Sequence, residues 1–334
     1  MLVSLLNTPF TVGDVTIRNR VLVAPMSGVS DLPFRLRAWQ AGAGLVVSEM
    51  VASGELVSAR KESHLRLSSD GIDQHVVQLA GRDPYLMAEA ARIAQNEGAD
   101  IIDINFGCPA KKVTGGYCGS ALMREPDFAL QLVEAVISAV DVPVTVKMRL
   151  GWDDDSINAP EIAQRCENVG VAMVSVHGRT RMQFYKGNAD WQAIKKVRER
   201  IKIPLVANGD VTCAEDALKL MEISGADAIM VGRACYGQPW LAGLMVDGFM
   251  PDDIAAYAIS HYEDMLSYYG VFAGKRHARK HLDWYISRHS AGLYSADERM
   301  ALVTELEPEK ATILLADILG RAHIDRNDNK QRVA

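Results

Sequence analysis

A single cysteine stands where a buried strand is expected to open into a loop. Cys108 follows Ile101–Gly107, a run whose apolar residues are typical of a strand buried on both faces in a parallel sheet. Gly107 permits a sharp turn, and Pro109 restricts the backbone directly after the thiol. A thiol in this position can act in chemistry as an acid or as a nucleophile. The alternative is a structural cysteine, because free cysteine is among the residue types most often buried.

The elements that would position this thiol recur along the chain in a regular alternation. Apolar runs rich in β-branched residues are separated by helix-period segments such as Pro84–Gly98 and Phe128–Val140. This alternation predicts βαβ units and a parallel sheet, and eight units favour an α/β fold closed into a (β/α)8 TIM barrel. The runs are Val21–Met26, Leu45–Met50, His75–Ala80, Ile101–Gly107, Pro143–Leu150, Met173–Arg179, Pro204–Asp210 and Ala228–Arg233.

Two further segments flank the predicted barrel. Phe10–Asn19 is expected to form a hairpin across the barrel's base, turning at Gly13 and Asp14. After Trp240 the strand pattern stops, and from Pro251 onward the pattern is helical, with the polar residues 326–334 expected to be frayed. We therefore predict a barrel domain at residues 1–245 and a small C-terminal helical domain at 250–334, with helices over Asp252–Tyr269, Gly274–Arg288, Ala296–Leu302 and Pro308–Leu319.

Polar side chains stand at the carboxyl ends of most predicted strands, where barrel enzymes carry their catalytic groups. Lys147 and Arg149 are spaced i, i+2, which places two cations on one face of the fifth strand. The backbone after the first strand could approach a flat ligand closely, at Pro25, Met26 and Ser27. The remaining strand ends carry Glu49, Gln78, Asn105, His177, Asn208-Gly209-Asp210 and Gly232-Arg233.

These strand ends match the needs of a flavin. A fixed cation such as Lys147 stabilises negative charge on a reduced flavin ring, and the amides of Gln78 and Asn105 could bond ring heteroatoms. Barrels often bind phosphate in the loops after strands seven and eight, where Gly209, Gly232 and Arg233 stand. The pattern predicts a site for flavin mononucleotide (FMN), with other phosphorylated ligands left open. The structural alternatives are an ion pair of Lys147 with Glu49 or Asp103, and a His177 that is merely satisfied near the core.

Composition excludes several classes of protein. The hydrophobic fraction of 49% is ordinary for a folded chain, and no apolar stretch approaches the ~20 residues of a membrane span. The first residues lack the basic region of a signal peptide, so we expect a cytoplasmic protein without a membrane partner. The five cysteines form no C-x-x-C pair, which indicates neither a disulfide framework nor a zinc ribbon, and we expect no metal. We also expect a monomer.

Taken together, four motifs resemble those of the tRNA-dihydrouridine synthases. They are Ala24–Asp31, Asn105–Pro109, Val176–Thr180 and Ala207–Asp210. The segment Gly274–Tyr285 is similar to the bacterial B-type branch of that family. The resemblance implies an enzyme that uses FMN and NADPH to reduce the C5–C6 double bond of a D-loop uridine in tRNA.

The resemblance also implies individual roles. Cys108 would be the general acid that gives a proton to C5, while hydride reaches the uracil from FMN. A thiol acid must stay neutral, so we expect Lys111 and Lys112 to contact RNA rather than the sulfur. Cys118 adds a second thiol nearby, whose role stays open. Implied flavin contacts are Pro25, Met26, Ser27, Gln78, Lys147 and His177, with Asn208, Gly209, Asp210, Gly232 and Arg233 for the phosphate; Asn105 belongs to the same expected site.

The formal net charge of −6 argues weakly against an RNA partner, so the cations that bind RNA must be local. On the predicted helix Gly274–Arg288, four cations at i, i+1, i+4 and i+5 share one face. A solvated helix face is the alternative. These cations are Lys275, Arg276, Arg279 and Lys280, and Arg179, Arg181, Lys111 and Lys112 would extend the basic area over the barrel mouth.

Two rival functions use the same residues differently. An FMN barrel that reduces a small pyrimidine or an enoate would not need the basic helical domain. A non-catalytic RNA-binding barrel would not need a flavin and would be colourless.

Overall fold

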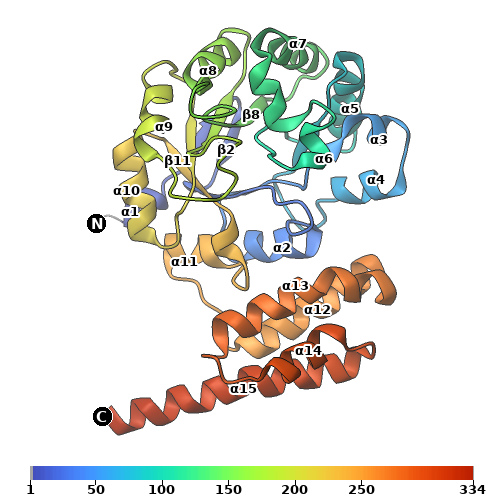
Figure 1. Ribbon diagram of the computed structural model, residues 1–334, viewed down its shortest axis with the longest axis vertical. Helices are drawn as coiled ribbons and strands as arrows, with labels where there is room; N and C mark the ends of the chain where they lie inside the picture. Colours follow the sequence, from blue (N-terminus) through green and yellow to red (C-terminus); the bar gives the residue numbers. More distant parts are fainter. Residues whose placement is uncertain (1–2, 334) are drawn as a thin grey trace. The chain divides into compact units, whose positions relative to one another are not determined.

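The computed structural model describes the backbone of residues 3–333 and the side chains of residues 5–321. It divides into two compact units (Figure 1). The first contains the residues up to Ala234 together with Leu241–Gly248, and the second contains Cys235–Trp240 and the residues from Phe249 onward. The sequence division at 245 and 250 places Cys235–Trp240 with the barrel, whereas in the structure this segment clusters with the helices. The separate functions expected of the two domains stay predictions.

The first unit is a parallel sheet that closes into a barrel. Its strands run in the order β4-β3-β11-β10-β9-β8-β7-β6-β5, and every neighbouring pair is parallel. A parallel bridge between Val47 and Val76 joins the two ends of this order, since β4 and β5 are two pieces of one barrel position. The predicted (β/α)8 fold is confirmed. The strands are β3 Val21–Val23, β4 Leu45–Val46, β5 Val51–Ala52, β6 Val76–Ala80, β7 Ile101–Phe106, β8 Val144–Arg149, β9 Met173–His177, β10 Leu205–Asn208 and β11 Ala228–Val231.

The second strand of the barrel is divided into β4 and β5, because between them the Ser48 hydroxyl replaces a backbone carbonyl as a hydrogen-bond acceptor. The Ser48 amide donates to Val76 O at 3.0 Å, but the Gln78 amide donates to the Ser48 hydroxyl at 3.0 Å rather than to a carbonyl. The same hydroxyl donates to Glu49 O at 2.9 Å. The predicted strand Leu45–Met50 therefore begins correctly but ends early, and pairing resumes at Val51.

Helices surround the sheet (Figure 1), and aspartates begin three of them. Asp31, Asp83 and Asp190 each accept a hydrogen bond from the third amide of the helix that follows, which satisfies a donor that the helix cannot. The helices are α1 Val3–Leu6, α2 Leu32–Gln40, α3 Ser53–Val57, α4 Lys61–Leu67, α5 Pro84–Asn96, α6 Lys111–Thr114, α7 Pro126–Ile137, α8 Ala159–Asn168, α9 Trp191–Arg198, α10 Ala214–Ser224 and α11 Leu241–Asp247, with 3-10 helices η1 Gly119–Arg124 and η2 Arg233–Cys235.

A hairpin fills the amino-terminal end of the barrel, as predicted. Strands β1 (Phe10–Val12) and β2 (Val15–Ile17) pair antiparallel around Gly13, whose φ is +60°. Val12 and Ile17 are fully buried in one apolar cluster with residues from the starts of the barrel strands, among them Leu22, Leu45, Val76, Ile101, Met173, Val206 and Ala228. With this end plugged, only the carboxyl end of the barrel is left for chemistry.

The second unit is helical and has its own aromatic core. Trp240 packs edge-on against Tyr257, with ring centroids 5.0 Å apart, and is stacked with His289 at 5.4 Å. His261 Nδ1 lies 3.0 Å from the Tyr285 hydroxyl. None of the helices within residues 3–333 combines the length and the apolar character needed to cross a bilayer. The helices of this unit are α12 Ile254–Tyr269, α13 Val271–His289, α14 Ala296–Thr304 and α15 Pro308–Val333.

Candidate active site

Cys108 follows β7 in a loop that is fixed from both sides. The Asn105 side-chain oxygen accepts the backbone amides of Gly107 at 3.1 Å and Cys108 at 2.9 Å. The Cys108 carbonyl accepts the Ser120 amide at 3.1 Å and the Ser120 hydroxyl at 2.9 Å. The half-buried thiol is therefore presented by a rigid turn, whose shape depends on the Asn105 side chain.

A chain of buried polar groups orients Asn105. Its amide nitrogen donates to Gln78 Oε1 at 2.7 Å, and Gln78 Nε2 donates to Asp103 Oδ2 at 2.7 Å. The Thr145 hydroxyl donates to the other Asp103 oxygen at 2.6 Å. Burial raises the pKa of the Asp103 carboxyl, and the hydrogen bonds from Thr145 and Gln78 oppose that shift. The chain links β6, β7 and β8 and engages the amides of Gln78 and Asn105 in the protein's own hydrogen bonds.

The Cys108 thiol is held in its neutral form. Burial raises its pKa, and this effect outweighs the lowering by the Ala110 backbone and by the cations Arg149 and Lys147. Lys111 and Lys112 are exposed at the start of α6 and are not among the groups that shift this pKa. Because a free thiol titrates at about 8.5, Cys108 is protonated at neutral pH.

Lys147 is a desolvated cation with spare donors. Its Nζ donates to Asn208 Oδ1 at 3.3 Å and to no other side chain among residues 5–321. Burial and, to a lesser extent, the neighbouring Arg149 lower the pKa of Lys147 to about 8, with Asp103 opposing the shift. Within the same residues neither Glu49 nor Asp103 forms an ion pair with Lys147, and Glu49 instead accepts the Gly28 amide. An ammonium group has three donors, so Lys147 can still bond a ligand in the mouth.

Arg149 ties the thiol loop to the loop after β9. Its side chain is 2% exposed, and its Nε donates to Gly107 O at 2.9 Å. Its Nη1 donates to the carbonyls of Thr180 and Phe184, each at 2.8 Å. Burial lowers the pKa of Arg149 to about 10, which leaves it charged at neutral pH. Sequence reasoning noted this cation but gave it no role in the site; its i, i+2 spacing from Lys147 was the available signal.

His177, at the end of β9, is neutral. It is 8% exposed, and its Nε2 lies 3.3 Å from Arg179 Nη1. Burial lowers its pKa well below the ordinary value, and Arg149, Lys147, Arg179 and Arg233 add repulsion. The imidazole can therefore exchange hydrogen bonds with a ligand but does not carry charge.

An exposed aromatic ring lies between two arginines near His177. The Tyr185 ring centroid is 5.4 Å from the Arg149 guanidinium carbon and 4.4 Å from that of Arg233. Half of Tyr185 is exposed, and its ring centroid lies 6.4 Å from that of His177. The mouth therefore offers a flat apolar surface bordered by cations.

The ends of β10 and β11, where a phosphate was predicted, combine free amides with a neutralised carboxylate. Asn208 Nδ2 donates to Met230 O at 2.7 Å and joins the two strands. Asp210 accepts Arg179 at 2.6 Å and has Arg233 3.7 Å away, so its charge is balanced. The backbone amides of Gly209, Asp210, Gly232 and Arg233 form no hydrogen bond with residues 5–321 and can bind an anion.

The loop after β3 reaches the same end of the sheet. The Met26 amide donates to the Ser30 hydroxyl at 2.8 Å, and Ser27 is exposed at the tip of the turn. A Cβ placed on Gly232 would lie 3.9 Å from Met26 Sδ, so this glycine and the loop are neighbours. Pro25 is half-buried at the start of the turn.

The predicted RNA-binding cations fall into two groups. Arg179 is 2% exposed and bonds Asp210 and the carbonyls of Lys186 and Gly187. Arg181 is 8% exposed, and its guanidinium lies 4.7 Å from the ring centroids of both Trp152 and Phe184. These two arginines contribute little charged surface.

The other cations are more accessible. Lys111 and Lys112 are exposed on α6. On α13, Arg276 and Arg279 are exposed and form no ion pair with residues 5–321, while the half-buried Lys275 and Lys280 donate to the carbonyls of Leu306 and His277. Arg276 and Arg279 are thus the cations of this helix that are best placed to meet a phosphate.

Comparison with known proteins identifies the family. The profile of the dihydrouridine synthase (Dus) family matches residues 22–316. The chain is 56% identical over 313 residues to a probable tRNA-dihydrouridine synthase of Rhizobium leguminosarum bv. phaseoli, covering 93% of this chain and 98% of the relative. It is 42% identical to tRNA-dihydrouridine synthase B of Xanthomonas campestris pv. campestris, covering 91% of this chain and 93% of the relative. The chain therefore belongs to the dihydrouridine synthase family of enzymes, as its motifs predicted.

Solved structures support the barrel fold. A morphinone reductase mutant in complex with tetrahydroNAD superposes with a TM-score of 0.52 at 17% identity, over 72% of this chain and 90% of that chain. Histamine dehydrogenase from Rhizobium sp. 4-9 superposes with a TM-score of 0.58 at 15% identity, over 74% of this chain and 48% of that chain. At these identities the likeness concerns the fold alone.

Proposed function

We propose that this chain is an FMN-dependent tRNA-dihydrouridine synthase that reduces the C5–C6 double bond of a D-loop uridine with NADPH. The observation that carries the proposal is the Cys108 thiol, fixed by Asn105 and Ser120 in the loop after β7 at the mouth of a barrel of this family, with the buried Lys147 among the cations that act on it. We further propose that the enzyme is cytoplasmic and monomeric, with the barrel as its catalytic domain.

The residues present at the mouth fit a flavin. Lys147 has donors to spare in a desolvated position, which suits a ring that gains negative charge on reduction. The free amides of Gly209, Asp210, Gly232 and Arg233, with the Arg233 side chain beside them, suit a phosphate. Met26 and His177 would border the ring, and Gln78 would act mainly through Asn105. When bound, FMN supplies the hydride that reaches C6 of the uracil.

Cys108 completes the reduction by giving its proton to C5. The raised pKa of the thiol keeps that proton available at neutral pH, and hydride addition makes C5 basic enough to take it. The thiolate left behind is stabilised by Arg149 and Lys147 until solvent returns a proton. Asn105 and Arg149 hold the loop in place during this exchange, and the neutral His177 hydrogen-bonds the uracil or the cofactor.

The base must leave the RNA stack to reach this thiol. Flipping a uridine out of a loop of folded RNA costs a few kcal/mol, and contacts between cations and phosphates offset that free energy. We assign these contacts to Lys111 and Lys112 at the mouth and to Arg276 and Arg279 on α13. Lys275 and Lys280 support that helix surface, whereas Arg179 and Arg181 are assigned to holding the loop after β9.

Dihydrouridine mapping tests the proposal. Cells lacking the protein are expected to lose dihydrouridine at a D-loop position, and wild type but not Cys108→Ala is expected to restore it. The purified protein is expected to be yellow and to bleach with NADPH. Dihydrouridine that is unchanged in the deletion strain, with no paralogue to supply it, would overturn the proposal. Loss of the helical domain without loss of flavin-dependent activity would favour a small substrate.

A further inference from the structure

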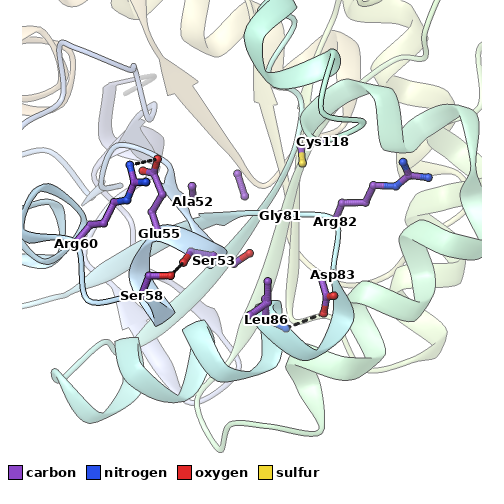
Figure 2. A pocket seen from close by; sticks show the side chains of 12 residues that line it. Ala52, Ser53, Glu55, Ser58, Arg60, Gly81, Arg82, Asp83, Leu86 and Cys118 are labelled. Atoms are coloured by element: carbon purple, nitrogen blue, oxygen red, sulfur yellow. Dashed lines mark hydrogen bonds and ion pairs between the residues drawn. The ribbon is translucent and has the colours of Figure 1, made fainter.

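A recess lies at the rim of the barrel, and none of the residues assigned to the proposed flavin site lines it. It has a volume of about 450 Å³ and lies where β5 and β6 end, next to α3 and the start of α5. Figure 2 shows Arg60 and Glu55 on one side, Cys118 and Arg82 on the other, and Leu86 between them. The remaining lining residues are Ala52, Ser53, Gly54, Ser58, Ala80, Gly81 and Asp83.

One wall of this recess is continuous with the turn that holds the candidate acid. Cys118 lines the recess and precedes η1, whose Ser120 fixes the Cys108 carbonyl. Gly119 has φ +61°, and a Cβ there would lie 2.9 Å from Cys108 O and 3.1 Å from Cys108 Cβ. A ligand in the recess would therefore lie one loop away from the reacting nucleotide.

The lining suits a nucleotide. Ala52, Ala80 and Leu86 offer an apolar surface for a base, and serines and arginines stand around them. Among residues 5–321, both arginines form only long ion pairs with exposed carboxylates, Arg60 with Glu55 at 3.4 Å and Arg82 with Glu125 at 3.6 Å. Exposed pairs of this kind contribute little to stability, so a phosphate can replace the carboxylate at little cost.

An exposed ring extends the surface at the rim. The Tyr117 ring centroid is 4.4 Å from the Arg82 guanidinium carbon, and half of the tyrosine is exposed. Tyr117 has φ +55°, a conformation that costs energy for a residue with a Cβ and that is enriched at functional sites.

We propose that this recess receives a nucleotide of the RNA substrate that neighbours the target uridine. The proposal rests on the proposed function and adds a base-binding subsite to it. Charge separates this occupant from the other candidate, the reductant NADPH. Two arginines and two carboxylates, Glu55 and Asp83, line the recess, so it has no net charge with which to hold a pyrophosphate and a 2′-phosphate. One phosphodiester that exchanges with a single carboxylate fits this balance.

Filling the recess tests the proposal. Ser58 is exposed and ends α3, so Ser58→Trp closes the recess without touching the core. Ser138→Trp is the matched control, because Ser138 is an exposed serine that likewise ends a helix, α7. Since stacking of one base is worth about 1–3 kcal/mol, Ser58→Trp is expected to raise both the Kd and the KM for tRNA about tenfold, with kcat within about twofold of wild type.

A modified substrate then identifies the occupant. Two tRNAs, each with an abasic site on one side of the target uridine, are compared on wild type and on Ser58→Trp. With wild type, one of the two abasic tRNAs is expected to have a KM about tenfold higher than that of intact tRNA. With Ser58→Trp, that abasic tRNA and intact tRNA are expected to have the same KM, because the variant has already removed the contact. Arg82→Gln is expected to weaken tRNA binding by severalfold, whereas Arg92→Gln, which removes a paired arginine from the same region of sequence, is the control.

Three outcomes would overturn the inference. The first is a Ser58→Trp variant with a wild-type KM for tRNA. The second is an equal rise in the KM for tRNA in Ser58→Trp and in the control Ser138→Trp. The third is a Ser58→Trp variant in which flavin reduction by NADPH slows as much as tRNA turnover, which would assign the recess to the dinucleotide. A wild-type protein that forms no dihydrouridine in any tRNA would overturn the proposed function itself, and this subsite with it.

Discussion

The pH dependence of uridine reduction distinguishes an acid from a nucleophile at Cys108. The experiment is a single-turnover reaction of reduced enzyme with tRNA, followed from pH 6.5 to 9. Burial raises the pKa of the thiol above its ordinary value of about 8.5, so at least about 97% of Cys108 is protonated at pH 7. The thiolate fraction is then about 3% or less, and it grows almost tenfold by pH 8.

The two roles therefore give different pH dependences. If Cys108 donates a proton, the thiol itself keeps the rate nearly constant between pH 7 and 8. Lys147, whose pKa is about 8 in the protein alone, is held in its charged form by the negative charge of a reduced flavin, so it adds no decline over that interval. If the thiolate were the reacting form, the rate would instead rise severalfold. A rate that rises through pH 7 to 8 refutes the acid role.

Variants give the size of the effect. Cys108→Ser keeps the shape of the side chain but replaces the thiol with a much weaker acid, so we expect uridine reduction to slow by about 10²–10⁴-fold. Reduction of the flavin by NADPH, measured in the same buffers, does not involve the acid and should keep its wild-type rate. Cys213→Ser is the matched control, because Cys213 stands at the start of α10, where serine is a favoured residue.

Three further predictions concern stability and RNA binding. Gln78→Leu removes the Gln78 partners of a buried Asp103 oxygen and of the Asn105 amide, which should lower the free energy of unfolding, measured in urea, by about 2–5 kcal/mol. A decrease of less than about 1 kcal/mol would contradict the buried network. Replacing both Arg276 and Arg279 with Gln should reduce the slope of log Kd for tRNA against log salt by about one per arginine, and an unchanged slope would remove α13 from the interface. Burial holds the pKa of His281 well below the value of about 6.5 that it has when unfolded, so its contribution to stability is complete above pH 6.5 and is lost as the pH falls, by up to about 1.4 kcal/mol per pH unit. His177 adds a loss of the same sign, so the fall in the free energy of unfolding between pH 7.5 and 5, measured in urea, should be smaller in His281→Phe than in wild type.

The sequence predicted the barrel because buried parallel strands leave a strong signal. Eight apolar runs appear at the expected positions, and the residues that end them meet at one end of the sheet. The break at Ser48 left no such signal, since it depends on one hydroxyl replacing one carbonyl in the ladder. Periodicity indicates which face a residue occupies, but it does not describe a loop.

Loop conformation explains what sequence reasoning about the site missed. The burial of Arg179 depends on the carbonyls of Lys186 and Gly187, and the role of Arg149 depends on those of Thr180 and Phe184. These acceptors are backbone groups in an irregular segment in which Phe184 has φ +52°. The directions of these carbonyl groups cannot be inferred from residue types. The sequence therefore showed that both residues carry charge, but not that they hold the loop in place.

The position of the thiol loop determines whether Cys108 can serve as the proposed acid. Two cations, Arg149 and Lys147, already pull its pKa down, and burial prevails over them by a margin that depends on distance. Asn105 and the Gln78–Asp103–Thr145 chain fix one side of the loop, and Arg149 fixes the other through Gly107 O. A loop that moved toward either cation would lower the pKa of the thiol and raise the fraction of thiolate, which has no proton to give. The buried polar chain, although it holds no reacting atom, therefore sets the protonation state on which the proposed reaction depends.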